Sequence, residues 1–505
     1  MGLPGGLQLE DGTSAGLRKP SPPLLCRFYD RAVGAFLVDV IATRPLSRTD
    51  TRSLVYVAAL GAAAVYFLIF PIWRGQFLVE IWPTESWNAY WQDAVSRGLP
   101  LYPDPTSLVG NNYPPLSFYG VALFGKLFAM GNLQAGRALS IVALVLLAIE
   151  ITGIVKILAG STFYGALGGL WYLAIMARNS TIYVGADDPQ LAGLAIMGAG
   201  LWWFLDRVAA ERDPTPALLL MVVAGFWKHN NIAIPLTCIS WLLITRNRFA
   251  VRGVMISGAA ALAGLGLCIT IYGPNFLPNM LATRSYGMGT LLANIGHLQW
   301  IALALFIWLF WALSSRRTAA ARFTMLHVGF GLFACLLQWL GHGVSGNAEF
   351  DLILAAAIGI GAAFAGASDT LLSHRVGPDR LRDIMVAALL LRLLASDRQE
   401  TALLFLSDDF RASLRGTETN LRFEASKVAI MPGNVECKTK LICRQAGKPF
   451  VVDEFKVEEM LLTGKATPQS IAEKMAAAGI TTFNETLPAT AQPKASLIYW
   501  LKNRH

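Results

Sequence analysis

The sequence predicts an all-α polytopic membrane protein with about eleven transmembrane helices and a small α/β C-terminal domain. Of its 505 residues, 54% are hydrophobic and only 15% are charged, whereas about a quarter of the residues in a soluble domain carry a charge. The mean hydropathy of +0.48 excludes a chain too polar to fold. Apolar segments close to the roughly 20 residues that cross a bilayer recur through most of the chain.

Residues 1–53 are expected to form a cytoplasmic N-terminal segment. They are rich in Pro, Gly and Arg, and they lack the short apolar core of a cleavable signal peptide. The first apolar segment, residues 54–73, is therefore expected to remain as the first membrane anchor.

The transmembrane domain is expected to occupy residues 54–396. Beyond the first segment, apolar stretches of membrane-helix type recur. They lie at residues 137–158, 161–177, 189–206, 215–227, 232–245, 252–273, 298–314, 323–341, 350–371 and 384–396. The last is the weakest, because it is short and contains Arg392.

The distribution of Arg residues predicts the orientation in the membrane. The apolar stretch 116–130 follows Tyr113-Pro114-Pro115, which breaks a helix. If this stretch lies along the outer surface, the Arg-rich connections all fall inside, as the positive-inside rule favours; if it crosses, they all fall outside. We therefore expect a large first periplasmic loop at residues 74–136. The formal charge of +9 is explained by topology, and no nucleic-acid partner is expected.

Residues 397–505 are expected to form a small soluble α/β domain on the periplasmic side, or on the cytoplasmic side if 384–396 does not cross. Short β-like runs at 427–430 and 450–452 precede a helical pattern at 468–478. Cys437 and Cys443 are the only cysteines of this tail, and both a disulfide and two free buried thiols remain open. No cysteines have metal-ligand spacing.

The first candidate site lies in the long loop after the first apolar segment. Glu85 stands among aromatic residues just above the membrane, and Glu80 precedes it. A carboxylate in a partly dry site acquires a raised pKa, which suits a general base. The alternative is a solvated acid beside an aromatic belt.

The second candidate site is the pair Asp187 and Asp188, directly before Pro189. One acid in this position is explained as the N-cap of the next helix. Because capping needs only one acid, the second suggests a functional role.

Further polar residues cluster at the outer ends of other segments. Lys228 and His229 suit a phosphate at the membrane surface; the alternative is a snorkelling lysine beside a polar turn. Asn347 lies in a Gly-rich outer connection, and Arg284 lies in the outer loop 274–297. Polar groups are energetically costly in a bilayer, so their clustering on one side of the membrane marks a functional face.

The order of these motifs resembles the GT-C superfamily of integral membrane glycosyltransferases. The motifs are an acidic first outer loop with Gly98-Leu99-Pro100-Leu101-Tyr102, then Tyr113-Pro114-Pro115, Asp188-Pro189 and Lys228. They look closest to bacterial protein mannosyltransferases, aminoarabinose transferases and rhizobial galacturonosyltransferases, over residues 54–370. The tail around Lys448-Pro449-Phe450 also looks like an extension of uncharacterised bacterial members.

The resemblance implies roles for individual residues. The family's catalytic acid pair appears as Thr84-Glu85, so the first acid is missing. Three alternatives follow: Glu85 takes over as the base, Glu80 contributes, or the chain is catalytically altered. Asp188 matches a second acid that orients the acceptor or the catalytic groups, and Lys228 matches a basic residue at the donor phosphate. From position alone, His229 and Arg284 join Lys228 at the phosphate.

The expected substrate-binding residues are Glu80, Tyr113, Asp187 and Asn347. The activity implied is inverting transfer of a sugar from a polyprenyl-phosphate donor to a glycan or lipid acceptor, such as lipopolysaccharide. It would take place on the periplasmic face of a bacterial inner membrane. Some relatives use a divalent cation, but one glutamate with distant aspartates is a thin ligand set, which favours metal-independent chemistry.

Two other functions remain open from the sequence. A lipid-linked sugar flippase or another transporter places ionisable groups near the middle of the membrane and often shows internal repeats, and neither feature is found. A non-catalytic envelope assembly factor is compatible with the missing acid. An enzyme requires Glu85 and Asp188 to converge, whereas a transporter requires a path through the membrane.

Overall fold

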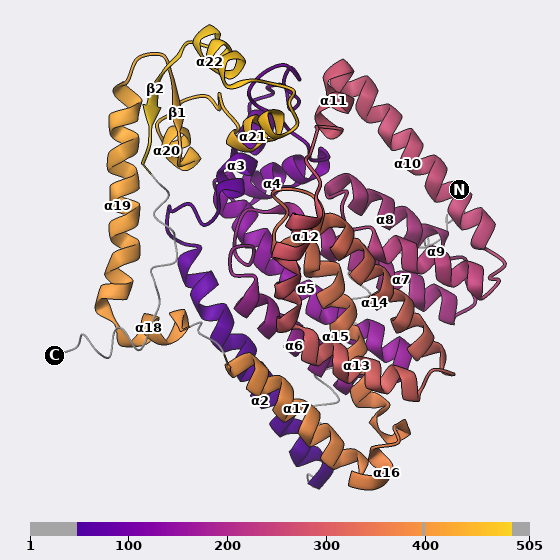
Figure 1. Ribbon diagram of the computed structural model, residues 1–505. Helices are drawn as coiled ribbons and strands as arrows, with labels where there is room; N and C mark the ends of the chain where they lie inside the picture. Colours follow the sequence, from indigo (N-terminus) through magenta and orange to yellow (C-terminus); the bar gives the residue numbers. More distant parts are fainter. Residues whose placement is uncertain (1–47, 396–398, 487–505) are drawn as a thin grey trace, which may run out of the picture. The chain divides into compact units, whose positions relative to one another are not determined.

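The computed structural model describes residues 48–395 and 399–486 and is mostly helical (Figure 1). Each predicted apolar segment centres on a helix. These helices are α2 (Arg48–Arg74), α5 (Asn132–Ala159), α6 (Thr162–Asn179), α7 (Pro189–Ala209), α8 (Thr215–Trp227), α9 (Ala233–Ile244), α10 (Ala250–Tyr272), α13 (Ala302–Ser314), α14 (Ala319–Trp339), α15 (Phe350–Ala365) and α17 (Pro378–Leu394). Short helices join them: α11 (Phe276–Met280), α12 (Met288–Asn294) and α16 (Ser373–Val376), with 3-10 turns η1 (Gly273–Asn275), η2 (Ile295–Trp300), η3 (Gly346–Glu349) and η4 (Ala367–Asp369).

The chain is an integral membrane protein. Within the described residues, six helical stretches are long and apolar enough to span a membrane, or up to seven if a pair bent by 72° forms one span. The six are Thr51–Arg74, Asn132–Ala159, Pro189–Ala209, Ala250–Met280, Ala319–Trp339 and Gly346–Ala365. The expected count of about eleven crossings is not confirmed, in part because α8 and α9 have only 13 and 12 residues. Each is about 20 Å long, short of the roughly 30 Å of a bilayer core.

Helix α15 forms the core of the bundle. It packs against α5, α6, α13 and α14, and every residue from Phe350 to Phe364 is buried. Its sequence is rich in Ala and Gly, whose small side chains let neighbouring membrane helices approach closely. A helix that is apolar on all sides belongs in such an interior position.

The first outer loop lies at one end of the bundle, where α2 ends and α5 begins; we call this the site end. The loop contains α3 (Pro83–Ser96) and α4 (Leu116–Leu127). Before α4, the Tyr113 ring packs on Trp87 of α3 with 5.0 Å between centroids. After α4, the Asn132 amide donates to Asp93 of α3 at 2.7 Å. Both ends of α4 therefore lie at the site end, and residues 116–130 do not run through the bundle.

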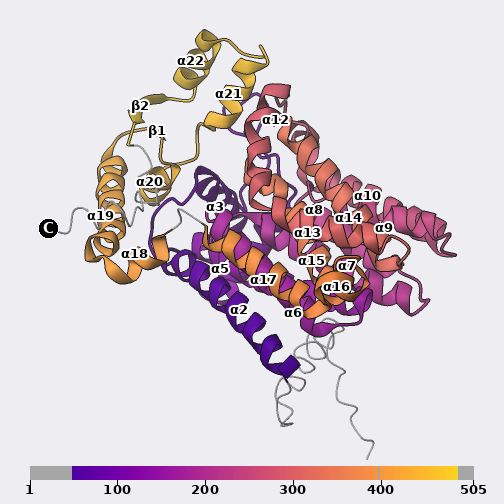
Figure 2. The same cartoon turned by 60° about the horizontal axis from the view of Figure 1, so that its bottom comes forward.

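Helix α17, the weakest expected crossing, runs alongside α2 in the same direction (Figures 1 and 2). Near their starts, Arg52 of α2 pairs with Asp379 of α17 at 3.2 Å. At the other end, the Arg178 guanidinium donates to the carbonyl of Leu393 at 2.8 Å. Because Arg178 is in the last turn of α6, at the site end, the tail that follows α17 starts on the same side as the first outer loop.

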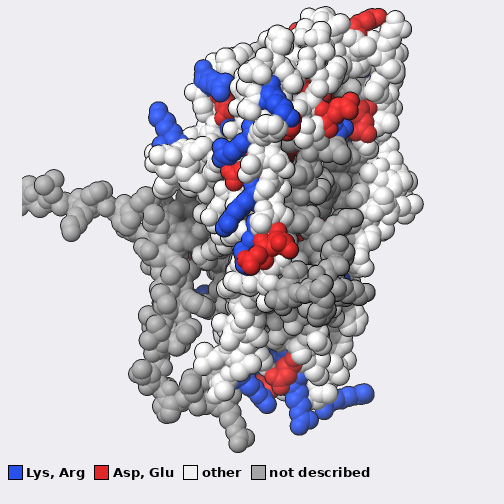
Figure 3. All heavy atoms as spheres, turned by 90° about the vertical axis from the view of Figure 1, so that its left-hand side faces the viewer, with Lys and Arg blue, Asp and Glu red and all other residues white. Residues whose placement is uncertain are grey.

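The tail contains five helices and one small sheet among its described residues. The elements are α18 (Glu400–Leu406), α19 (Asp408–Ile430), β1 (Asn434–Cys437), α20 (Lys440–Gln445), α21 (Glu454–Leu462), α22 (Pro468–Ala477) and β2 (Ile480–Asn484). β1 and β2 pair in parallel, with Val435 opposite Thr482. On the face that Figure 3 shows, charged side chains gather over the tail and again at the opposite end of the bundle.

The structure decides three points about the tail. Cys437 and Cys443 form a disulfide, one of the two states that the sequence leaves open. The helix expected at 468–478 is present as α22, but the β-like runs at 427–430 and 450–452 are not strands. The first is the last turn of α19, because Val428 continues the buried face formed by Leu421 and Ala425. The second is extended chain without a pairing strand.

Candidate functional site

Glu85 lies in the first turn of α3 and is buried, with 2% of its surface exposed. Its carboxylate receives hydrogen bonds from Arg137 at 2.6 and 2.7 Å. The backbone N–H groups of Ile81 and Asp187 also donate to it, each at 3.0 Å. Both oxygens are therefore occupied by protein donors, in a geometry that fits a planar guanidinium.

Arg137, in the first turns of α5, is the partner that the sequence analysis missed. Besides Glu85, it donates to the backbone carbonyls of Gly75, Phe77 and Val79 at 3.2, 2.6 and 2.6 Å. These contacts use all five N–H groups of a guanidinium. Arg137 thus fixes the chain leaving α2 against the start of α5. The sequence did contain a signal for this role. Arg137 stands at the beginning of an apolar segment, and a charge in that position requires a partner.

Asp187 joins the same network. Its side chain accepts a hydrogen bond from Gln92 of α3 at 2.8 Å, and its carbonyl accepts one from Asn88 at 2.8 Å. A Cβ at Gly136 of α5 would lie 1.9 Å from its carboxylate oxygen, so only glycine leaves room there. Burial raises the pKa of Asp187 well above its usual value. Asp187 therefore connects the first outer loop, α5 and the turn before α7.

Asp188 caps α7, as one sequence interpretation expected. Its Oδ1 accepts a hydrogen bond from the Gln190 N–H at 2.8 Å. Burial raises the pKa of Asp188, and the nearby Lys228 ammonium opposes this rise. Because Glu85 accepts the N–H of the preceding residue, Asp187, the two predicted catalytic acids do converge at the site end.

Lys228 follows the last residue of the short helix α8 and is 2% exposed. Its Nζ lies 3.2 Å from the centroid of the Tyr113 ring, in a close cation–π contact. Among the described residues, none accepts a hydrogen bond from this ammonium or forms an ion pair with it. Burial lowers the pKa of Lys228 to about 8, with the Asp188 carboxylate opposing the decrease. Lys228 is thus a buried cation with no hydrogen-bonded anion in the described parts of the chain.

Arg284 is a second cation near Lys228. Its guanidinium lies over the ring of Phe455, 5.3 Å from the centroid, and it contributes to lowering the pKa of Lys228. Within the described parts of the chain, the guanidinium has no hydrogen-bond or ion-pair partner. The site end therefore brings together two cations, each on an aromatic ring and neither paired with an anion within the described residues.

The remaining predicted site residues do not all lie near the two cations. Tyr113 lies under Lys228, and Asn347 accepts a hydrogen bond from the Tyr183 hydroxyl at 3.3 Å. His229 is exposed. Glu80 is buried on the side of the tail, beside Ser86 and near Lys440, and burial raises its pKa to about 8. Glu80 therefore belongs to the contact between loop and tail.

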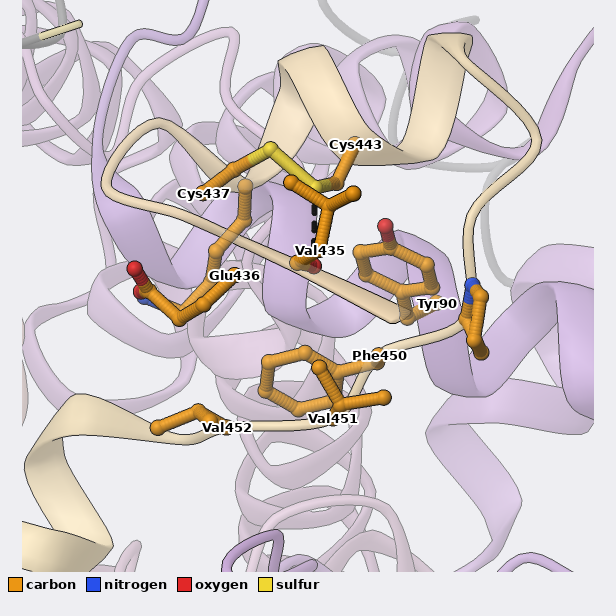
Figure 4. A pocket seen from close by; sticks show the side chains of 10 residues that line it. Tyr90, Val435, Glu436, Cys437, Cys443, Phe450, Val451 and Val452 are labelled. Carbon is orange, nitrogen blue, oxygen red and sulfur yellow. Dashed lines mark hydrogen bonds between the residues drawn. A yellow bond between two sulfur atoms is a disulfide. The ribbon is translucent and has the colours of Figure 1, made fainter. Parts of the chain in front are cut away.

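The tail packs against the first outer loop through contacts that sequence reasoning did not predict. Asp453 accepts a hydrogen bond from the Trp87 indole at 3.0 Å. Beside this contact, Phe450 stacks on Tyr90 at 5.1 Å between centroids, close to the disulfide of the tail (Figure 4). No local sequence signal identifies such contacts, since Trp87 and Asp453 are 366 residues apart.

The described residues contain no group of three or more His, Cys, Asp or Glu side chains that could hold a metal ion. The charged groups that the described part of the site brings together are carboxylates, an ammonium and guanidinium groups.

No protein-family model matches the sequence, and no curated protein matches it. Several solved structures are similar to the chain. ArnT from Cupriavidus metallidurans in the apo state is similar with a TM-score of 0.53 and 16% identity, over 85% of this chain and 90% of that chain. The chain adopts the GT-C fold. ArnT from the same organism bound to undecaprenyl phosphate gives a TM-score of 0.51 and 14% identity, over 85% of this chain and 89% of that chain.

A third GT-C structure is similar at a lower level. It is the archaeal oligosaccharyltransferase AglB from Archaeoglobus fulgidus, in complex with an inhibitory peptide and a dolichol-phosphate. Its TM-score is 0.47, with 10% identity over 79% of this chain and 64% of that chain. The two ArnT structures confirm the GT-C fold that was expected from the motifs. The roles of the individual residues rest on the geometry described above.

Proposed function

We propose that this protein is an inverting glycosyltransferase that moves a sugar from a polyprenyl-phosphate donor to a glycan or lipid acceptor of the cell envelope. The observation that carries the proposal is Lys228 at the site end of a GT-C fold, a buried ammonium to which no anion among the described residues is hydrogen-bonded. A phosphate group would supply the missing anion. The related ArnT, which has been solved with undecaprenyl phosphate, supports a donor of this class.

The reaction assigned to the site is a displacement at the anomeric carbon. The acceptor oxygen bonds to C1 of the sugar while the bond between C1 and the phosphate oxygen breaks. The polyprenyl phosphate leaves with the electron pair, and negative charge grows on its oxygens. Lys228 and Arg284 stabilise that charge, and their effect is strong because the surroundings are partly dry.

The two acids have different roles in this proposal. Glu85 is a positioning residue, since its oxygens are taken by Arg137 and two backbone amides. The Asp188 carboxylate raises the pKa of Lys228, and its Oδ1 is used for capping. Its other oxygen is assigned to orient the acceptor hydroxyl and take its proton, for which a raised pKa is suited.

The proposed location is the periplasmic face of a bacterial inner membrane. The positive-inside pattern places the site end opposite the Arg-rich connections. The disulfide in the tail fits an oxidising compartment on that side. The proposed chemistry uses the chain's own cations at the phosphate.

The test is release of free polyprenyl phosphate by the purified protein in lipid. The protein is offered a panel of polyprenyl-phosphate sugars together with an extract of envelope lipids. Lys228→Met and Asp188→Asn are expected to abolish release. Lys126→Met serves as a matched control, because Lys126 is an exposed lysine of α4 at the same end. No release from any donor by folded wild-type protein would overturn the proposal.

A further inference from the structure

Helix α21 of the tail connects two parts of the site end. On one side, Asp453 at its N-cap accepts from Trp87, and the Lys456 ammonium donates to the carbonyls of Pro105 and Val109 at 3.0 and 2.7 Å. Both acceptors belong to the first outer loop. The tail is thus held to the first outer loop, and Figure 1 shows α21 beside α3 of that loop. The same loop contains Tyr113, on whose ring Lys228 lies.

On its other side, α21 holds the segment that contains Arg284. Glu459 is 3% exposed and accepts the backbone N–H of Ser285. Its second oxygen contacts the His342 ring at 2.7 Å. The residue after Arg284 and the connection at 341–344 are therefore fixed to the same turn of α21.

Phe455 lies between these anchors and contacts Arg284 directly. The His342 ring stacks on Phe455, with 6.1 Å between centroids and an interplanar angle of 6°. A Cβ on Gly343 would lie 2.2 Å from the Phe455 ring, and Gly343 has a φ of +70°. The stem of Arg284 packs against Gly341, where an added Cβ would be 3.0 Å from Cδ. These contacts give the guanidinium a defined place although it has no hydrogen-bond acceptor among the described residues.

We propose that α21 completes the donor site by positioning Arg284 for the phosphate, with Phe455 as the positioning residue. This inference rests on the proposed function, because it takes the anion to be the phosphate of a polyprenyl donor. An aromatic face attracts the guanidinium without consuming its N–H groups. All five donors of Arg284 then remain available for phosphate oxygens. The tail is therefore part of the catalytic unit.

The arrangement resembles that of Lys228 in physical terms. Each cation rests on a ring, Tyr113 or Phe455, and neither is neutralised by a hydrogen-bonded carboxylate among the described residues. A carboxylate partner would compete with the phosphate for the cation. A ring holds the cation in place and leaves its charge for the ligand.

The test is binding of undecaprenyl phosphate to the full-length protein in lipid nanodiscs, at fixed ionic strength. Phe455→Leu keeps an apolar side chain but removes the ring, and we expect about three- to tenfold weaker binding. Phe455→Tyr keeps the ring and should bind like the wild type. Arg284→Ala should weaken binding at least as much as Phe455→Leu. In the Arg284→Ala background, Phe455→Leu should have no further effect, because the two residues act as one unit.

The matched control is Phe450→Leu, which removes another ring from the contact between tail and loop, where it packs on Tyr90 and Trp91. It should leave binding unchanged. If Phe455→Leu binds like the wild type, weakens binding equally in the Arg284→Ala background, or is matched by Phe450→Leu, the inference is wrong. If wild-type protein does not bind undecaprenyl phosphate at all, the proposed function fails first.

Discussion

Replacing Glu85 by glutamine separates a positioning role from a chemical one. The carboxylate forms the only ion pair that Arg137 has among the described residues, with 2% of Glu85 and 3% of Arg137 exposed. Glutamine has nearly the same size, but it removes the negative charge and turns one acceptor into a donor. The Arg137 charge then stays buried without compensation.

The magnitude follows from the burial of the pair. Removing one partner of a buried ion pair costs about 3–5 kcal/mol of unfolding free energy. One of the N–H donors from Ile81, Asp187 or Arg137 also loses its acceptor, which contributes to the upper end of this range. We therefore expect Glu85→Gln to lower the unfolding free energy by about 4 kcal/mol.

The assay is reversible unfolding in mixed micelles, titrated with SDS and followed by tryptophan fluorescence. Asp188→Asn is the comparison variant, because asparagine caps helices about as well as aspartate and should leave stability nearly unchanged. Asp188→Asn should abolish the release of polyprenyl phosphate without lowering the unfolding free energy. If Glu85→Gln is as stable as the wild type and releases no polyprenyl phosphate, Glu85 is a chemical group and the positioning role is refuted.

Two further predictions concern pH. Glu80 has its pKa raised by burial to about 8 from 4.5, so the folded protein retains a proton that the unfolded chain releases, and stability should decrease between pH 4.5 and 8 by up to about 1.4 kcal/mol per pH unit. Glu80→Gln should remove this dependence in SDS titrations at pH 5 and 8; an unchanged slope would contradict it. For Lys228, with a pKa lowered by burial to about 8, binding of undecaprenyl phosphate should weaken as pH rises above about 8, by up to tenfold per unit. Lys228→Arg should shift this decrease upward, whereas Glu80→Gln should not, and a profile flat to pH 10 would show that Lys228 does not bind the phosphate.

The sequence alone was sufficient to predict the apolar helices of the bundle and the membrane class, although the expected number of crossings is not confirmed. Hydropathy is a property of neighbouring residues, so a helix long enough to cross a bilayer is visible locally. The Pro-Pro pair before α4 and the Arg-rich connections likewise indicated that residues 116–130 lie along the surface. The residues that matched family motifs, Asp188 and Lys228, are indeed close together at the site end.

The local sequence pattern did not predict the structure where the burial of a residue depends on distant parts of the chain. Residues 427–430 have a β-like composition but continue the buried face of α19, because Val428 packs with the tail core. The cysteines alone did not decide between a disulfide and two thiols, since pairing depends on the turn that brings Cys437 and Cys443 within 5.8 Å between Cα atoms.

Only the tertiary structure decided what each charged group does. The sequence placed Glu85 in an aromatic loop, but its partner Arg137 is 52 residues away and becomes a neighbour only when α3 packs on α5. Likewise, Phe455 meets Arg284 only after the tail folds back onto the first outer loop. A side chain's chemistry is set by the donors, acceptors and rings that surround it, and in this chain those groups come from segments that only packing brings together.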